Sequence, residues 1–286
     1  MATIQNACHE LHKSDANRTR EATVTEEKIL KITRIVHSCV LIDLGGRQVL
    51  TDPWFSEKMG YHFGEELGMS VESLPPLSGV VVSHDHPDHN DMKSFRRYAD
   101  NRVPLICEGK AAARAKRAGF ENVTVLDTWE EASIGPVNVT AVPALHGVPE
   151  VGYVIQASGF TVYFAGDTLL IPELSDISDR FPNIDVALLP INGLKIFGDQ
   201  VVMNPIEAAQ LCEVLQPRVA IPTHYAFKGG GLADRMFLKY FDRQERLPQI
   251  FQDAMRRYAP QTRVEVLEPG QRVSIEGQLH APRRIA

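Results

Sequence analysis

This chain is organised around one stretch, Ser83-His84-Asp85-His86-Pro87-Asp88-His89, which reads H-x-H-x-D-H from its first histidine. The stretch follows residues 79–82, a short continuous apolar run that predicts a strand buried on both faces. Three imidazoles and an unpaired aspartate at the end of such a strand are unfavourable unless something cationic compensates for them. We therefore expect a metal site at this point.

Three further candidate ligands follow, each near the end of an expected strand. They are His146, Asp167 within Gly166-Asp167-Thr168, and His224 within Pro222-Thr223-His224-Tyr225. Each alone could be a core, turn or strand-end residue, but with the first stretch they make a set of five histidines and two aspartates. Imidazoles and carboxylates suit borderline divalent ions, with zinc favoured and manganese or iron as alternatives. Such a set is too large for one tetrahedral ion and predicts a two-metal site.

The spacing of these residues divides them into two triads. His84 and His86 are two positions apart, so both can point the same way in an extended segment. Asp88 and His89 follow across a turn in which Pro87 limits the backbone, and can face a second ion. We expect the first ion to be bound by His84, His86 and His146, and the second by Asp88, His89 and His224.

Asp167 and Asp88 are expected to carry the chemistry. Asp167 has two carboxylate oxygens and can bridge ions roughly 3.5–4 Å apart. A water in the remaining bridging position would lose a proton readily between two cations, which provides a hydroxide nucleophile near neutral pH. Asp88 would relay a proton. The sequence thus predicts a hydrolase that cleaves an ester-type bond, a lactone or a phosphoester, in a small anionic substrate.

The composition limits the kinds of partner. The chain has 286 residues, 44% of them hydrophobic, and a formal net charge of −6 with acidic and basic residues interspersed. No basic stripe emerges, so we expect a small-molecule substrate and no nucleic-acid partner. The longest apolar stretches are strand-length, which predicts no integral membrane segment, and a homo-oligomer stays open.

The start of the chain and its cysteines indicate a cytoplasmic protein. Residues 1–25 are polar and charged and lack the apolar region of a secretory signal. The cysteines form no C-x-x-C pair, which predicts reduced and mostly buried thiols. They are Cys8, Cys39, Cys107 and Cys212.

The chain reads as an arm followed by a single domain. Residues 1–25 show no clear period, so we expect a flexible or loosely docked N-terminal arm, with residues 26–286 as one hydrolase domain. Strands are expected over residues 31–36, 40–44, 48–50, 79–82, 123–126, 137–142, 219–222, 263–267 and 271–275. Helices are expected over residues 91–98, 110–118, 205–215, 236–240 and 247–258. The third of these helices has Asn204 as its N-cap and Glu207 at position N3.

Two segments of the domain share one pattern. Residues 40–52 and 154–167 each read as a strand, a glycine-containing turn and a second strand ending in an aspartate, Asp52 or Asp167. Two halves of this kind, each a sheet with helices outside, would pack sheet against sheet with the metal ions at one edge.

The ordered ligand set resembles that of the metallo-β-lactamase superfamily, over about residues 31–275. Finer motifs are similar to those of the branch that contains ascorbate-6-phosphate lactonase and the N-acylphosphatidylethanolamine type of phospholipase D. These motifs are Thr51-Asp52-Pro53, Asn204-Pro205-x-Glu207-Ala208 and Pro222-Thr223-His224-Tyr225. The resemblance implies the α/β class and an αββα sandwich, in which two mixed β-sheets are flanked by helices.

The resemblance also implies the same two ligand triads, with Asp167 shared between the ions. Antibiotic-hydrolysing members of the superfamily most often have a cysteine near this position, which argues against β-lactam turnover as the native role. Asp52 would orient a ligand or the nucleophilic water, because metal-binding histidines need hydrogen-bonding partners. A simple turn aspartate before Pro53 is the alternative reading of Asp52.

Four other residues are candidates for contact with the substrate. His37 could reach the site or be a satisfied core histidine. Tyr225 and Lys228 come just after the last expected ligand and could bind an anionic group. His62 lies in a loop rich in glycine and phenylalanine that could close over a ligand.

Two other classes of function stay open. A nuclease or a cyclic-nucleotide-type phosphodiesterase of the same fold would need a basic groove, which the net charge of −6 does not suggest. A non-catalytic metal-binding regulatory protein is the other alternative. The complete ligand set argues against it, because such a protein would not need every ligand.

Overall fold

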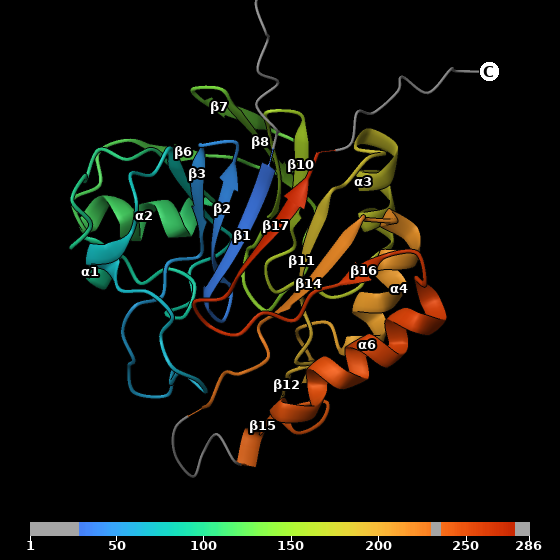
Figure 1. Cartoon of the computed structure of the whole chain (residues 1–286). Coiled ribbons are helices and arrows are strands. Elements are labelled where there is room, and N and C mark those ends of the chain that lie inside the picture. The colour runs from blue at the N-terminus through green and yellow to red at the C-terminus, as the bar shows by residue number, and fades with distance from the viewer. Residues whose placement is uncertain (1–28, 230–235, 278–286) are drawn as a thin grey trace, which may run out of the picture.

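The computed structural model describes residues 29–229 and 236–277, which form two large β-sheets packed face to face and one small sheet (Figure 1). The expected N-terminal arm, residues 1–25, lies outside the described residues. Helices flank the pair of large sheets on both outer sides (Figure 1). The expected αββα sandwich of two mixed sheets is confirmed.

The first large sheet has the order β17-β1-β2-β3-β4-β5-β6. Adjacent strands of this sheet are antiparallel from β17 to β3 and parallel from β3 to β6. Its strands are β1 (Ile29–Val36), β2 (Cys39–Leu44), β3 (Gln48–Thr51), β4 (Gly79–Val82), β5 (Leu105–Cys107), β6 (Val123–Val125) and β17 (Arg272–Glu276). The buried run expected over residues 79–82 is therefore a strand, and all of its residues are buried.

The second large sheet has the order β16-β14-β11-β10-β9-β8-β7. It is antiparallel from β7 to β10 and parallel from β10 to β16. Its strands are β7 (Glu131–Ile134), β8 (Val137–Val142), β9 (Gly152–Ala157), β10 (Phe160–Phe164), β11 (Val186–Pro190), β14 (Val219–Thr223) and β16 (Arg263–Val264). Both large sheets thus repeat one pattern, as the two similar sequence segments predict.

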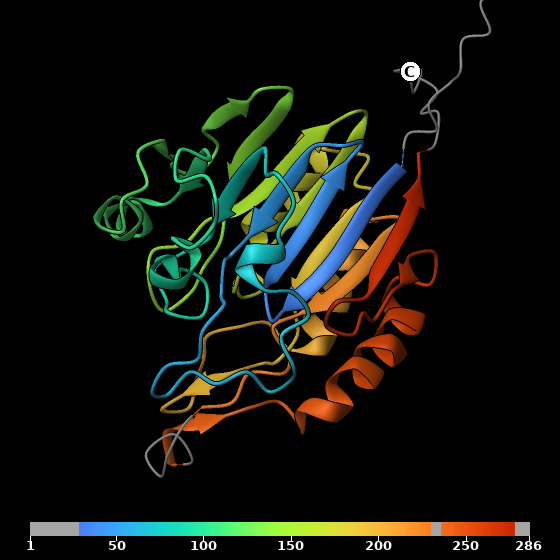
Figure 2. The ribbon, with the colours of Figure 1, turned by 60° about the vertical axis from the view of Figure 1, so that its left-hand side comes forward.

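The small sheet and one long loop lie at the same end of the molecule (Figures 1 and 2). The small sheet is antiparallel, in the order β13-β12-β15, and consists of β12 (Lys195–Ile196), β13 (Asp199–Gln200) and β15 (Leu238–Lys239). The loop joins β3 to β4, and an isolated bridge between His62 and Lys228 ties it to the segment after β14.

Three hydrophobic layers stabilise the sandwich. The central layer lies between the large sheets and includes the buried Ile42 and Tyr153. Phe95 packs in the layer outside the first sheet, and Leu211 and Phe251 in the layer outside the second. Burying a side chain of this size contributes roughly 1.5–3 kcal/mol.

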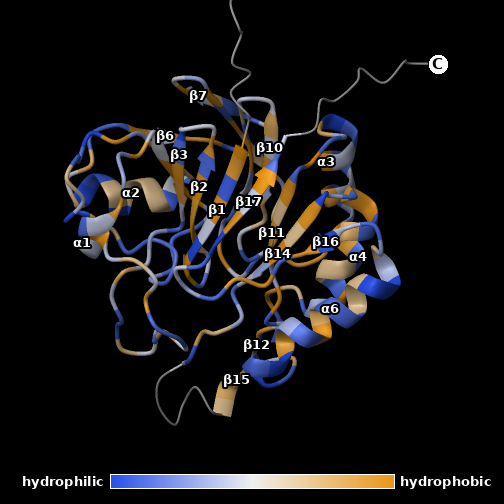
Figure 3. Ribbon diagram, in the orientation of Figure 1, coloured by the Kyte–Doolittle hydropathy of each residue, from blue (hydrophilic) through white to orange (hydrophobic). Residues whose placement is uncertain are grey.

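Figure 3 shows β11 and β14 in hydrophobic colours. In α6, hydrophobic and hydrophilic residues alternate along the helix, as expected for a helix with one buried face.

The helices of the described residues are short to medium in length. They are α1 (Met92–Phe95), α2 (Gly109–Arg117), α3 (Ser175–Arg180), α4 (Pro205–Leu215) and α6 (Leu247–Tyr258). Short 3₁₀ turns cover Val71–Ser73, Pro172–Leu174 and Gln244–Arg246. Among the described residues, no helix has the length and apolar character needed to cross a membrane.

Two expected helices differ from the structure. α1 covers only Met92–Phe95 instead of residues 91–98. The Asp91 carboxylate does not cap it, because that group accepts from Ser56 Oγ and pairs with Lys58 Nζ. The prediction of a helix over residues 236–240 is wrong at Leu238–Lys239. These two residues form strand β15, which pairs with β12. The period of a run this short does not separate helix from strand. The expected strand 263–267 pairs only over Arg263–Val264.

The described cysteines match the expectation of buried, unpaired thiols. Cys39, Cys107 and Cys212 are free and buried. Burial raises the pKa of Cys107 to about 12 and holds the pKa values of the other two well above the usual range. Cys8 lies outside the described residues. The cytoplasmic location stays a prediction.

Asn204 begins α4 as the sequence predicts, and its replacement tests the cap. The Asn204 side chain accepts from the backbone N–H groups of Ile206 and Glu207, while the Glu207 carboxylate accepts from Asn204 N. We expect Asn204→Ala to lower the free energy of unfolding by about 1 kcal/mol and the Tm by roughly 2–4 °C in thermal circular dichroism. Asn204→Asp keeps the acceptor and should match the parent. An unchanged Tm for the alanine variant would contradict the capping role.

Candidate metal centre

The predicted ligands meet because their strands end at one edge of the sandwich. The H-x-H-x-D-H stretch follows β4, and His224 follows β14. His146 and Asp167 come after β8 and β10, which run in the same direction because both are antiparallel to β9. The turn between β1 and β2 adds His37, whose φ of 53° lies in the left-handed region. The structure therefore brings together all seven residues predicted as ligands.

The first cluster consists of His84, His86 and His146. His84 Nε2 lies 2.9 Å from His86 Nδ1, and His146 Nε2 lies 3.4 Å from the same atom. Burial lowers the pKa of His84 and of His86 to about 3, so both rings are neutral, the form that binds metals. His146 Nδ1 donates to Val201 O at 2.6 Å, which leaves its Nε2 as the metal-facing nitrogen.

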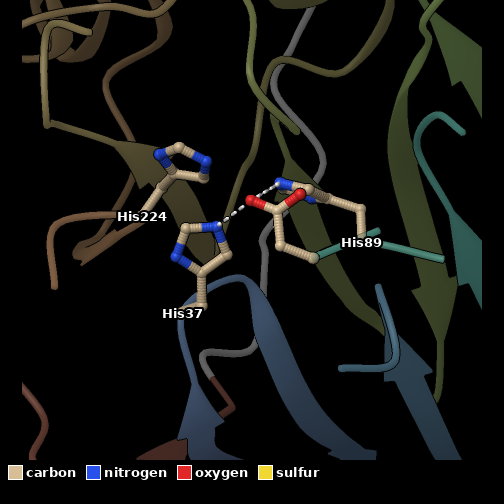
Figure 4. Close-up of side chains that lie close together, drawn as sticks. His37, His89 and His224 are labelled. Atoms are coloured by element: carbon tan, nitrogen blue, oxygen red, sulfur yellow. Dashed lines mark ion pairs between the residues drawn. The ribbon is translucent and has the colours of Figure 1, made fainter. Parts of the chain in front are cut away.

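The second cluster consists of His37, Asp88, His89 and His224, and Figure 4 shows its three histidine side chains close together. Asp167 Oδ2 lies 2.8 Å from His224 Nε2 and 3.2 Å from His89 Nε2. Asp88 Oδ2 lies 3.3 Å from His37 Nε2 and 3.8 Å from His89 Nε2. The His37 and His224 rings are 3.9 Å apart between centroids. Donor atoms from both sheets thus converge on one small space.

The buried carboxylates around His89 favour positive charge in this cluster, and some of their oxygens have no hydrogen-bond partner among the described residues. Both features suit a bound cation. Burial disfavours a charged His89, but Asp167, Asp88 and Asp52 outweigh it and raise its pKa well above the usual value. Asp88 Oδ1 and Asp167 Oδ1 are buried without a hydrogen-bond partner among the described residues, and His89 Nε2 and His224 Nε2 both face the other oxygen of Asp167. Buried polar groups are normally satisfied, and a divalent ion would satisfy these. The donor set therefore suits metal binding.

Asp52 holds His89 in place. One Asp52 oxygen accepts from Ser83 N and the other from Ser83 Oγ, both at 2.7 Å. The second oxygen also lies 2.6 Å from His89 Nδ1. This contact directs His89 Nε2 toward Asp167, as an outer partner of a metal-binding histidine should. The geometry favours the orienting role over a simple turn aspartate.

Two further positioning residues could not be found from the sequence. Asn192 Nδ2 lies 2.7 Å from His224 Nδ1, and Asn192 Oδ1 accepts from Leu194 N at 3.0 Å. The buried Glu150 accepts from the backbone N–H of Asp167 and lies 3.5 Å from His84 Nδ1. Neither residue belongs to a motif, and neither is close in sequence to its partner.

Three of the suggested substrate contacts belong to neither cluster. Tyr225 donates its hydroxyl to Leu267 O at 3.3 Å, and the Arg34 guanidinium covers its ring. Lys228 lines a separate hollow of about 580 Å³ that includes none of the clustered histidines. His62 Nδ1 lies 3.4 Å from Glu57 Oε2. Of the four suggested contacts, only His37 is a member of one of the clusters.

A cavity of about 210 Å³ opens onto both clusters. Its floor consists of His86, Asp88, His146, Asp167 and His224. Its walls are Gly60 and five larger side chains, Tyr61, Leu194, Ile196, Phe227 and Leu238. The walls come from the β3–β4 loop, the small sheet and the segment after β14. A small molecule in this cavity would contact the clustered donors directly.

Comparisons with known proteins agree with the fold and with a metal-dependent hydrolase. A family model described as "Beta-lactamase superfamily domain" matches residues 47–225. A UPF0173 metal-dependent hydrolase of Deinococcus radiodurans is 35% identical over 213 residues, covering 69% of this chain and 85% of the relative. A UPF0173 metal-dependent hydrolase of Caldivirga maquilingensis is 28% identical over 240 residues, covering 82% and 93%.

Solved structures resemble the chain in fold. Igni18, a metallo hydrolase of Ignicoccus hospitalis, is 22% identical with a TM-score of 0.64, covering 87% of this chain and 100% of that one. An isothiocyanate hydrolase from Delia radicum gut bacteria is 16% identical with a TM-score of 0.68, covering 86% and 100%. At these identities the likeness concerns the fold alone.

The role of Asp52 can be tested by Asp52→Asn. The amide has only one acceptor oxygen, so it cannot accept from Ser83 N and also face His89 Nδ1 and Ser83 Oγ, and His89 should lose its orientation. We expect zinc affinity, measured by competition with a chelator, to fall by about 10–100-fold. Asp43→Asn, near the end of β2, removes a carboxylate that belongs to neither cluster, and this variant should bind zinc as the parent does. Unchanged affinity in Asp52→Asn would exclude the positioning role.

Proposed function

Because the chain belongs to the metallo-β-lactamase superfamily, as a metal-dependent hydrolase of the UPF0173 family, we propose that it cleaves an ester-type bond at two divalent ions. The observation that carries this proposal is the pair of neighbouring donor clusters at the floor of one cavity. Within each cluster the potential ligand atoms lie within 4.8 Å of one another. A lactone or a phosphoester is the proposed type of substrate.

The proposal assigns one ion to His84, His86 and His146, and the other to Asp88, His89 and His224. Zinc is favoured by the mixture of imidazoles and carboxylates, with manganese or iron as alternatives. Bound in this way, such ions supply Lewis acidity and lower the pKa of water.

Asp167 is proposed as the ligand shared by the two ions. Its Oδ2 contacts His89 and His224, and its Oδ1 has no hydrogen-bond partner among the described residues. The backbone N–H of Asp167 donates to Glu150, which fixes the main chain at this point. The free carboxylate oxygen can therefore serve a second ion without breaking an existing contact.

Asp88 is proposed to move the proton. It lines the cavity, and its Oδ1 is likewise without a hydrogen-bond partner in the described part of the chain. Asp88 would take a proton from the attacking water and return it to the oxygen of the leaving group. His37 Nε2, 3.3 Å from the other Asp88 oxygen, holds the carboxyl group in place.

The alternatives are less well supported by the site. A nuclease would need cations along an open groove, whereas the cavity holds only about 210 Å³ and no Lys or Arg is among its described lining residues. A non-catalytic regulatory protein would have no need for a substrate-sized cavity over the donors. The finer likeness to the ascorbate-6-phosphate lactonase and N-acylphosphatidylethanolamine phospholipase D branch rests on short motifs and belongs to the proposal.

Asp167→Ala tests the shared ligand and the hydrolase function together. We expect it to lose one of two metal equivalents in elemental analysis and to lower turnover by more than about 100-fold, because the remaining donors leave one ion incomplete. Turnover is measured on a lactone, a phosphodiester, a phosphomonoester and a β-lactam, with added zinc or manganese. Asp179→Ala removes an exposed aspartate of α3 and serves as the control.

The metal content of the parent protein decides the outcome. About two ions per chain with lactone or phosphoester cleavage supports the proposal. Full metal content and turnover in Asp167→Ala would exclude the shared-ligand role. A parent protein without metal and without turnover under either ion would overturn the hydrolase proposal.

A further inference from the structure

We propose that the part of the substrate beside the reacting bond is uncharged and apolar, as in an alkyl or aryl ester or an alkyl-substituted lactone. The inference deepens the proposed function and rests on it. It departs from the sequence-based expectation of an anionic substrate, and the walls of the cavity carry it.

The cavity walls are apolar and come from separate parts of the chain. Ile196 of β12 faces Leu238 of β15 across an antiparallel pair, and both line the cavity. Phe227 follows β14 and is 5% exposed, with its ring centroid 5.8 Å from that of Tyr61. Leu194 precedes β12 and completes the wall. Apolar side chains that converge above a polar floor favour an apolar group on the ligand.

The charges of the lining residues also favour an uncharged group on the substrate. The ionisable side chains of the floor all belong to the two clusters, and the described lining includes no Lys or Arg. Lys58, on the neighbouring loop, pairs with Asp91 at 2.9 Å, and Lys228 lines the separate hollow. A second negative charge on the substrate would therefore meet no counter-charge among the described lining residues, which is unfavourable.

The size of the cavity limits the apolar group. A volume of about 210 Å³ is below the roughly 300–1,000 Å³ of common ligand pockets, so a short chain or one ring fills it. Two exposed aromatic side chains next to the small sheet are not among the described lining residues of the cavity. Phe197 is 75% exposed and Phe237 is 40% exposed, and their ring centroids are 4.7 Å apart.

The test measures binding of alkyl hydroxamates, which chelate divalent ions and carry a variable tail. Zinc-loaded protein is titrated by calorimetry with acetohydroxamate, butyrohydroxamate, hexanohydroxamate and octanohydroxamate. Each methylene buried should tighten binding by about fourfold until the cavity is full. Succinic monohydroxamate, whose tail ends in a carboxylate, should bind more weakly than the neutral hydroxamate of similar length.

Two neighbouring substitutions locate the effect in the cavity. Ile196→Lys places a charge in the wall, whereas Phe197→Lys places the same charge on the exposed residue that follows β12. We expect Ile196→Lys to abolish the gain per methylene and to strengthen binding of succinic monohydroxamate. Phe197→Lys should keep the chain-length dependence of the parent. The parent series needs no substitution, so it decides the inference even if Ile196→Lys fails to fold.

The outcomes separate this inference from the proposed function. Equal affinity along the neutral series, or a preference for the carboxylate-ended probe, overturns the apolar substrate class while leaving the metal centre in place. Chain-length dependence that persists in Ile196→Lys also overturns it, because the tail would then lie elsewhere. Absence of both zinc and acetohydroxamate binding removes the proposed function and the inference with it.

Discussion

The rest of the site depends on the His89 imidazole, which is held between two buried carboxylates. Asp52 lies 2.6 Å from its Nδ1 and Asp167 lies 3.2 Å from its Nε2. Asp52 follows β3 of the first sheet and Asp167 follows β10 of the second, so this one ring links the two sheets at their common edge. The spacing of the two carboxylates is therefore set by the packed core between the sheets. Because such cores are close-packed, the sandwich itself provides the rigidity that a metal centre requires.

The two aspartates occupy equivalent places in the two halves of the fold. In each large sheet an antiparallel series of strands gives way to a parallel one, and the aspartate follows the strand at which the change occurs. Their surroundings then divide their roles. Ser83 and His89 engage both oxygens of Asp52, whereas Asp167 keeps one oxygen without a hydrogen-bond partner among the described residues. One backbone pattern, used twice, thus places a positioning residue on one side of His89 and the proposed shared ligand on the other.

The sequence predicts well the elements that depend on local patterns of residues. It misses the features that depend on contacts between residues distant in the chain. β4 was predictable because a continuous apolar run precedes a cluster of ligands, and α4 because its capping residues stand at fixed spacing. Asn192 was not predictable, because it meets His224 across the gap between the ends of β11 and β14. The contact made by the Tyr225 hydroxyl was not predictable either. Neighbouring residues after a strand can point in opposite directions, and its hydroxyl turns away to Leu267 O. β15 depends entirely on its partner β12, so its own residues carry too little signal.

The floor and the walls of the cavity come from different kinds of structure. Strand ends of the two large sheets position the donor atoms, while a loop and the small sheet supply Tyr61, Ile196 and Leu238. Loops and small edge sheets tolerate change far better than packed strands do. Relatives can therefore share the donor set yet differ in what they admit to it, which is why family membership gives the class of reaction and leaves the substrate to the walls. In this chain the described walls offer hydrophobic contact and no counter-charge, so the reacting group alone would meet the polar floor.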